Sequence, residues 1–390
     1  MPYKAILTME DKTLDKEGNT LRNSVIKKLV DGINDASLDA VIGISPENFA
    51  YTTGFIVPSH PVLRWRHALT VITADGQNAV MCVDMEESTV RERMPNTDLR
   101  VWKEFSYDAM PILAELLDDL GLKNARVGIE MDYIPAGDMA MLRKHLPNTR
   151  WEAAEQLYNK LRMIKTPEEL EILKNLSRIT DSSIKTALES VTAGSTEMDI
   201  AAAITSSILR NGADDYKFLI VASGERSQYP NVGPTDRILI EKDLIRLEIF
   251  GMLSGYHAGI CRTASVGNPT EEAEQIWSNL SECREIILEN IRPGVKASDV
   301  YSKFLEKFGE LALKPISFVG HGIGLFLHEE PYLGANSDTI LESGMVLGIE
   351  PLAYVEGRFG LQCKDMIVIT EDGCQLFSDV TNTNNIFRVS

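Results

Sequence analysis

The chain has 390 residues, of which 44% are hydrophobic and 25% are charged, and its formal net charge is −18. This length is enough for two domains with separate cores. The acidic balance disfavours binding to nucleic acid or to anionic lipid, and no stretch is long and apolar enough to predict a membrane span.

Two further features of the sequence predict a cytoplasmic protein. Residues 1–12 include acidic side chains and lack the apolar stretch of a secretory signal. The cysteines are five in number and scattered, which is typical of reduced thiols rather than of disulfides or a zinc site. They are Cys82, Cys261, Cys283, Cys363 and Cys374.

The first 155 residues alternate between helical and strand patterns, which predicts an α/β domain. Apolar residues at helical spacing predict helices over 21–33 and 109–120. Short apolar runs between turn residues predict four strands, over residues 40–44, 68–72, 78–83 and 126–129.

A domain boundary is predicted near residues 155–165, ahead of a helix that starts at Thr166. Proline at position 167 and glutamate at position 169 complete the pattern of a capping box with proline at the first helical position. This pattern marks the start of a helix and therefore of a new folding unit. We expect an N-terminal domain at 1–158 and a second domain at 159–390.

The second domain contains one short pattern twice. Residues 194–200 and 294–300 both read as glycine, four variable positions, aspartate and an aliphatic residue, one hundred positions apart. Each copy lies between a long and a short helical pattern, and an apolar strand follows, at 219–224 and 316–320. Such a duplication predicts pseudo-twofold halves with a site in the cleft between them.

Several motifs in order resemble the superfamily of creatinase, prolidase and aminopeptidase P. They are SPENFAYTTGF at 45–55, LRMIKTPEE at 161–169, GHGIG with HEEP at 320–331, and GMV with EP at 344–351. The resemblance covers nearly the whole chain. It implies an α+β protein with a creatinase-type α/β N-terminal domain and a pita-bread catalytic domain made of pseudo-twofold αβ halves.

The same resemblance implies a metal site of two aspartates, one histidine and two glutamates, and this sequence departs from it. The matching positions hold Glu248, Gly259, His321, Glu350 and Lys364. Glycine offers no ligand, and a lysine ammonium repels cations and can neutralise two glutamates. Too few ligands remain for two metal ions. We therefore expect neither a metal nor a cofactor.

The metal-free relatives creatinase and ectoine hydrolase, which the sequence resembles at 248–263, suggest how such a site could work. We predict that His321 and His328 share the acid and base roles, and that Glu350 positions the water. Both relatives use a histidine as proton shuttle where this sequence has Asn231, and asparagine cannot accept a proton near neutral pH.

The remaining candidates are predicted to bind the substrate. They are Glu248, Lys364, Asn231, Tyr256, Arg262, Tyr51 and Arg64. For Glu248 and Lys364 an alternative stays open, namely a buried structural ion pair that replaces the metal cluster. Arg262 has a structural alternative too, and Tyr51 and Arg64 rest on the weakest pattern.

Together these features predict a metal-independent hydrolase of an amide or amidine C–N bond in a small, polar, nitrogen-rich compound. The resemblance implies a homodimer in which the N-terminal domain of one subunit covers the cleft of the other. Two alternatives stay open. One is a metallo-aminopeptidase or dipeptidase for Xaa-Pro bonds, favoured by the GHGIG and HEEP motifs. The other is a catalytically silent module that binds a peptide or protein partner.

Overall fold

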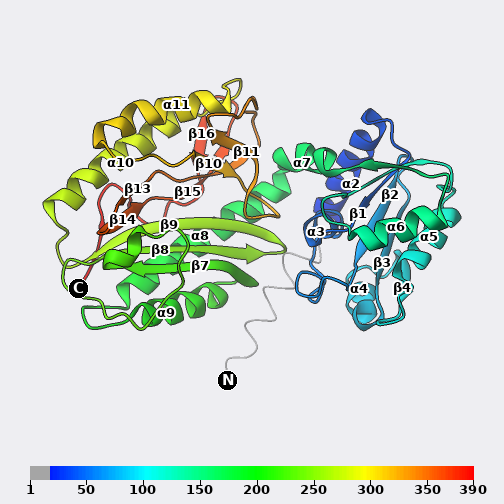
Figure 1. The fold of residues 1–390 in the computed structure, drawn as a ribbon, viewed down its shortest axis with the longest axis horizontal. Helices are drawn as coiled ribbons and strands as arrows, with labels where there is room; N and C mark the ends of the chain where they lie inside the picture. Colours follow the sequence, from blue (N-terminus) through cyan, green and yellow to red (C-terminus); the bar gives the residue numbers. More distant parts are fainter. Residues whose placement is uncertain (1–17) are drawn as a thin grey trace. The chain divides into compact units, whose positions relative to one another are not determined.

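The computed structural model describes residues 18–390, and it divides into two compact units, Met1–Arg162 and Met163–Ser390 (Figure 1). The predicted absence of a secretory signal concerns residues that lie outside the described range. Within that range, no helix is both long and apolar enough to cross a membrane.

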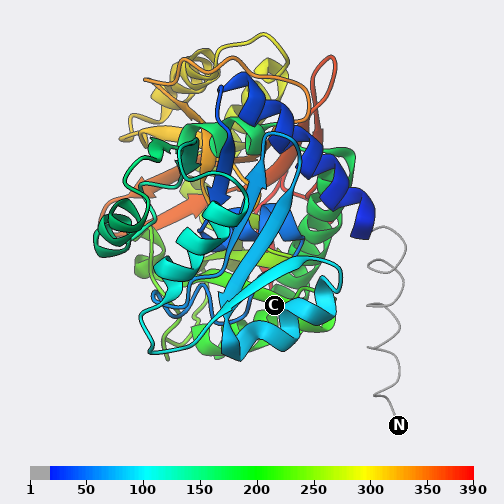
Figure 2. The ribbon, with the colours of Figure 1, turned by 90° about the vertical axis from the view of Figure 1, so that its right-hand side faces the viewer.

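The N-terminal unit is built on a six-stranded sheet with the order β4-β3-β2-β1-β5-β6. This unit, in blue to cyan, faces the viewer in Figure 2. The strands are β1 (Ala40–Gly43), β2 (Leu69–Thr73), β3 (Asn78–Val83), β4 (Asp98–Trp102), β5 (Arg126–Ile129) and β6 (Arg150–Ala153). The helices are α2 (Gly18–Asp35), α3 (Pro46–Thr53), α4 (Glu87–Arg93), α5 (Ala109–Asp119), α6 (Ala136–His145) and α7 (Glu155–Met163). Each strand and helix predicted in this region is present, with ends shifted by a few residues.

The pattern analysis did not assign β4, β6, α3, α4, α6 or α7, and of these helix α3 lies within the 45–55 motif. Ser45 accepts a hydrogen bond from the Asn48 backbone N–H at 3.1 Å, Pro46 opens the first turn, and Gly54 ends the helix at φ +81°. These are the ordinary start and stop signals of a short helix. They could have been recognised within the 45–55 motif.

Burial of His60 makes the stability of the N-terminal unit sensitive to acid. Its side chain packs edge-on against Phe49 and Tyr133, and burial together with the nearby His67 lowers its pKa to about 4. The unfolded chain takes up a proton near pH 6.5, whereas the folded unit does so only near pH 4. Above pH 6.5 protonation of His60 therefore has no effect on the free energy of unfolding. Between pH 6.5 and 4 it lowers this free energy by up to ~1.4 kcal/mol for each pH unit.

We expect the variant His60→Gln to lose this part of the pH dependence between pH 6.5 and 4. Urea unfolding at several pH values, compared with wild type, measures the difference. His145 is exposed at the end of α6, so His145→Gln is the matched control and should leave the slope unchanged. An equal slope in wild type and His60→Gln would contradict the expectation.

The C-terminal unit contains three sheets, ordered β17-β9-β8-β7, β11-β10-β12-β15-β16 and β13-β14. Two helices, α8 (Pro167–Glu189) and α9 (Glu197–Arg210), pack on the first sheet, and α11 (Ala297–Phe308) packs on β10 and β11 of the second beside α10 (Glu271–Asn290) (Figure 1). The first sheet consists of β7 (Asp215–Ser223), β8 (Leu244–Leu253), β9 (Tyr256–Val266) and β17 (Phe387–Val389). The other strands are β10 (Phe318–Gly322), β11 (Glu329–Gly334), β12 (Val346–Ile349), β13 (Leu352–Val355), β14 (Phe359–Gln362), β15 (Asp365–Ile369) and β16 (Cys374–Leu376).

The predicted start of α8 is confirmed. The Thr166 side chain accepts from the Glu169 backbone N–H, the Glu169 carboxylate accepts from the Thr166 backbone N–H, and Pro167 occupies the first turn. The capping box satisfies donors that would otherwise lack partners at a helix start.

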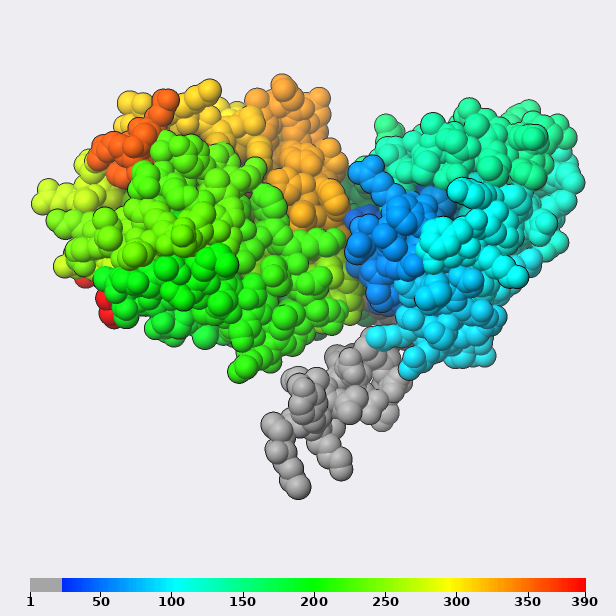
Figure 3. All heavy atoms as spheres, turned by 60° about the horizontal axis from the view of Figure 1, so that its bottom comes forward, coloured from blue at the N-terminus to red at the C-terminus, as the bar shows by residue number. Residues whose placement is uncertain are grey.

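The predicted duplication is confirmed down to single hydrogen bonds. Gly194 and Gly294 have φ +93° and +86°, and each precedes the shorter helix of its half, α9 or α11. The Gly194 N–H donates to Leu239 O and the Gly294 N–H to Leu341 O, both at 2.9 Å. In the space-filling view the first half, in green, and the second half, in yellow to orange, form adjoining surfaces (Figure 3).

These two glycines should tolerate alanine equally badly. A Cβ at either position meets nothing within 4 Å, so the cost comes from the left-handed backbone alone and should be ~1–2 kcal/mol in each half. Gly309 also has open space but a right-handed φ of −57°, and Gly309→Ala should be neutral or slightly stabilising. Urea unfolding tests all three variants, and a loss in one half only would contradict the equivalence of the halves.

Candidate active site

Strands from both halves of the C-terminal unit bring five side chains together. Glu248 lies on β8 of the first sheet, and His321 lies on β10 of the second. Glu350 directly follows β12, and Lys364 directly precedes β15. His328 lies in the loop after β10, and its ring stacks on His321 with centroids 3.7 Å apart and planes 16° apart.

The Lys364 ammonium is at the centre of this cluster. Its Nζ lies 3.3 Å from Glu248 Oε1, 3.2 Å from Glu350 Oε2 and 3.0 Å from His321 Nε2. The side chain is 1% exposed. Burial lowers the pKa of Lys364, but the two carboxylates outweigh burial and the net shift is upward. The lysine is therefore charged.

An aromatic ring closes the remaining side. The Lys364 Nζ lies 4.5 Å from the centroid of the Phe250 ring, within cation–π range. Phe250 pairs with Gly259 across β8 and β9, and any Cβ at position 259 would collide with this ring. The space that a side chain at 259 would need is therefore filled by Phe250.

Hydrogen bonds assign the tautomer of His321. Its Nδ1 lies 2.8 Å from the carbonyl oxygen of Gly322, which can only accept, so Nδ1 carries the proton. Nε2 is then the acceptor of the Lys364 ammonium. The lone pair that a general base would need is thus already engaged.

His328 differs from His321 in its surroundings. It is half-buried, and no side chain that the structure describes forms a hydrogen bond with it. Burial lowers its pKa to about 4, and the neighbouring His321 and Lys364 act in the same direction. His328 is therefore neutral near pH 7, with a ring nitrogen able to accept a proton.

Glu350 is held in its ionised form. Burial by itself would raise its pKa, but the charge of the adjacent Lys364 ammonium acts in the opposite direction, and the net pKa is about 2. Gln362 Nε2 donates to Glu350 Oε2 at 3.2 Å, and Arg246 donates in turn to Gln362 Oε1 at 2.8 Å. The carboxylate is fixed by this chain of side chains.

Arg262 is committed to structural contacts. Its Nε lies 3.1 Å from Asp181 Oδ1 and its Nη2 lies 2.9 Å from Asp365 Oδ1, with all three side chains buried. Its Nη1 donates to the carbonyl oxygen of Lys364 at 2.8 Å. Arg262 thus positions the backbone that carries the central lysine.

Two further predicted binding residues of the C-terminal unit, Tyr256 and Asn231, lie outside the cluster. Tyr256 is buried and its hydroxyl contacts Glu169 Oε1 at 3.0 Å, whereas Asn231 is exposed in the loop between η2 (Gly224–Gln228) and β8. Tyr51 and Arg64 belong to the N-terminal unit. The Tyr51 hydroxyl donates to Leu161 O at 3.4 Å and Arg64 is exposed.

Two residues of the cluster were missed in the sequence. Phe250 follows Glu248 by two positions on β8, and Gln362 precedes Lys364 by two positions at the end of β14. Alternate residues of a strand face the same side. Both residues lie two positions from a predicted site residue, Glu248 or Lys364, and this spacing could have identified them.

The metal ions that the resemblance implies do not fit these residues. Among residues 18–390, no group of three or more His, Cys, Asp or Glu side chains is arranged to hold an ion. The point on which Glu248, Glu350 and His321 converge is taken by the Lys364 ammonium. No chemical step is therefore assigned to a metal.

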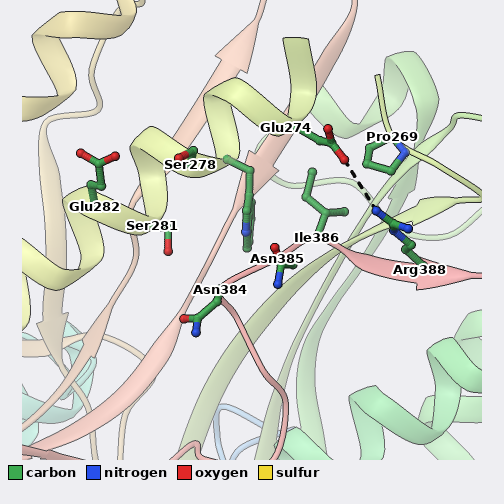
Figure 4. A pocket seen from close by; sticks show the side chains of 10 residues that line it. Pro269, Glu274, Ser278, Ser281, Glu282, Asn384, Asn385, Ile386 and Arg388 are labelled. Carbon is green, nitrogen blue, oxygen red and sulfur yellow. Dashed lines mark ion pairs between the residues drawn. The ribbon is translucent and has the colours of Figure 1, made fainter. Parts of the chain in front are cut away.

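A cavity of about 390 Å³ lies elsewhere in the C-terminal unit, between α10 and residues 384–388 (Figure 4). Among the residues around it, Arg388 Nη2 forms an ion pair with Glu274 Oε1 at 3.7 Å. None of the residues around this cavity belongs to the cluster. The cavity and the cluster are therefore separate features.

Comparison with known families identifies the class of the protein. Residues 171–371 match the metallopeptidase family M24, and residues 26–164 match the creatinase/prolidase N-terminal domain. The chain belongs to the M24 metallopeptidase family. The predicted fold, a creatinase-type N-terminal domain followed by a pita-bread domain, is confirmed.

Individual relatives extend this assignment. The chain is 36% identical over 223 residues to a probable dipeptidase PepE of Mycobacterium tuberculosis, covering 56% of this chain but only 60% of that protein. It is 28% identical over 355 residues to the Xaa-Pro dipeptidase of Pyrococcus furiosus, in a match that covers 90% of this chain and 96% of that protein. The structure of a dipeptidase from Pyrococcus horikoshii OT3 matches with TM-score 0.82 and 28% identity over 93% of this chain and 99% of that one.

These relatives correct the predicted function. Metal-independent hydrolysis of a small nitrogen-rich compound, as in the metal-free creatinase branch, is contradicted because the relatives are named as dipeptidases and Xaa-Pro dipeptidases. The prediction went wrong because it inferred the substrate from missing metal ligands. The absence of metal ligands bears on the charge at the reacting centre and does not by itself identify the substrate.

Proposed function

We propose that this protein hydrolyses the peptide bond of short peptides, with Xaa-Pro dipeptides as the first candidates. The observation behind the proposal is the match to the Pyrococcus furiosus Xaa-Pro dipeptidase, which extends over 96% of that protein. A match of this extent includes both units rather than the pita-bread unit alone. The retained cluster of His321, His328 and Glu350 supports a hydrolytic role.

In the proposed reaction His328 exchanges the proton. Peptide hydrolysis requires a base that takes a proton from water and an acid that returns it to the leaving nitrogen. The neutral His328 accepts the proton while the water oxygen bonds to the carbonyl carbon. It then gives the proton to the amide nitrogen as the C–N bond breaks, which releases an acid and an amine. The His321 ring stacks on the His328 ring and holds it in place.

A second candidate is peptide binding without cleavage. Lys364 forms ion pairs with both Glu248 and Glu350, so each carboxylate already has a cationic partner inside the cluster. A carboxylate held in this way is a weaker acceptor for a water proton. The fold would then present a peptide site in which hydrolysis is slow or absent.

The test is an assay with a panel of Xaa-Pro dipeptides and the corresponding Xaa-Ala dipeptides. Full-length protein is used as purified, after chelation, and with added Mn²⁺ or Co²⁺, and released amino acids are measured by mass spectrometry. Release of proline supports the proposal. Binding in a calorimeter without release supports the second candidate. Neither release nor binding under any of these conditions overturns both.

A further inference from the structure

We propose that the Lys364 ammonium is the resident cation of this site, and that it blocks a latent divalent-metal site formed by Glu248, Glu350 and His321. This role of Lys364 depends on the charge at the cluster and is independent of whether the protein cleaves peptides.

The first support is that the contacts of the ammonium are complete. A lysine ammonium has three N–H donors and no acceptor. Three acceptors surround Lys364 Nζ, namely Glu248 Oε1 at 3.3 Å, Glu350 Oε2 at 3.2 Å and His321 Nε2 at 3.0 Å. The Phe250 ring covers a further side at 4.5 Å. The site is therefore built around one compact cation.

The second support is that the lysine cannot easily leave. Its backbone N–H and C=O pair with Cys261 at 3.1 and 3.2 Å, which joins the two sheets at this point, and Arg262 donates to the same carbonyl at 2.8 Å. A Cβ at position 348 would lie 3.2 Å from Lys364 Cε, so Gly348 allows the side chain to pass close to β12. Backbone and side chain are both held.

The third support is the chemistry that would remain without the ammonium. Two buried carboxylates would face an imidazole with no counter-charge, which is unfavourable in a dry site. Carboxylate oxygen and imidazole nitrogen are also ligands that suit Mn²⁺ and Zn²⁺. When the lysine charge is removed, the three side chains that now surround the ammonium should therefore bind a divalent ion instead.

The experiment compares Lys364→Gln and Lys364→Glu with wild type. Each full-length protein is first dialysed against a chelator, then titrated with Mn²⁺ in a calorimeter, and melting is followed with and without the ion. The matched control is Lys165→Gln, because Lys165 is another buried lysine of the same unit, paired with Glu329 at 3.3 Å. It lies outside the cluster and should not create a site.

We expect saturable binding of about one Mn²⁺ per chain by both Lys364 variants, tighter for the variant with the added carboxylate. At a hundredfold excess over Kd, the ion should raise their Tm by at least ~4 °C. Wild type and Lys165→Gln should show neither effect. If a Lys364 variant does not fold alone, Mn²⁺ added during refolding should restore its yield.

Three results would overturn the proposal. Wild-type protein that binds Mn²⁺ as tightly as the variants would show that the ammonium does not block the site. Folded Lys364 variants that both fail to bind Mn²⁺ or Zn²⁺ would show that no latent site exists. Lys364 variants that stay unfolded when Mn²⁺ is added during refolding would also show that no latent site exists. These readouts are binding and melting, so they are independent of the peptide assay.

Discussion

Replacing His328 by alanine is expected to lower kcat for Xaa-Pro hydrolysis by roughly 10²–10⁴-fold, the usual contribution of a general acid–base group. His328 is the half-buried histidine of the cluster, and its pKa of about 4 keeps it neutral and able to accept a proton. Initial-rate kinetics with one Xaa-Pro dipeptide measure the effect. KM should change much less than kcat.

The control for this variant is His145→Ala. His145 is exposed on α6 of the N-terminal unit, so its loss should leave both kinetic constants close to wild type. A folded His328→Ala protein that keeps wild-type kcat would remove His328 from the proposed reaction. His321 would then be the next histidine to test, although its Nε2 accepts from Lys364.

The largest loss of stability is expected from Arg262→Met. The buried guanidinium faces Asp181 at 3.1 Å and Asp365 at 2.9 Å, and methionine would leave Asp181 without its cationic partner. Asp365 would keep Arg284, whose Nε lies 2.6 Å from Asp365 Oδ2. Removal of one member of a buried ionic cluster typically costs ~3–5 kcal/mol. Urea unfolding of the full chain, followed by circular dichroism, measures the change.

Arg178→Met is the matched control for this loss. Arg178 pairs with Asp379 at 3.3 Å in the same unit, but the two side chains are 57% and 51% exposed. Exposed ion pairs contribute at most ~1 kcal/mol, so this variant should unfold nearly as wild type does. Equal effects of Arg178→Met and Arg262→Met would show that burial is not the source of the stability.

The sequence analysis named Arg262 as a substrate-binding candidate with a structural role as its alternative, and the structure places the side chain in a buried ionic cluster. In the sequence, an arginine at this position is compatible both with a structural role and with binding a substrate carboxylate. Its partner Asp181 lies 81 positions away on helix α8, whereas Arg262 lies on strand β9. A contact over such a separation follows from the packing of α8 on β9 and leaves no local pattern.

Local patterns were sufficient for much of the fold. The capping box at Thr166 and Glu169, four of the six strands of the N-terminal sheet (β1, β2, β3 and β5) and the repeated glycine turns at Gly194 and Gly294 all depend on residues close together in the chain. Such features have a regular period or a fixed spacing. They can therefore be read from the order of residues.

The cluster around Lys364 shows the opposite case. The residue types at positions 248, 321, 350 and 364 could be chosen from the sequence, because a resemblance of motifs pointed to them. Three features of the cluster arise only because β8 and β9 of one sheet meet β10, β12 and β15 of the other. The ammonium reaches both carboxylates, the Phe250 ring fills the space beside Gly259, and His321 accepts a hydrogen bond at Nε2. Electrostatic contacts depend on distances of a few ångströms between strands remote in the chain, so tertiary packing determines them.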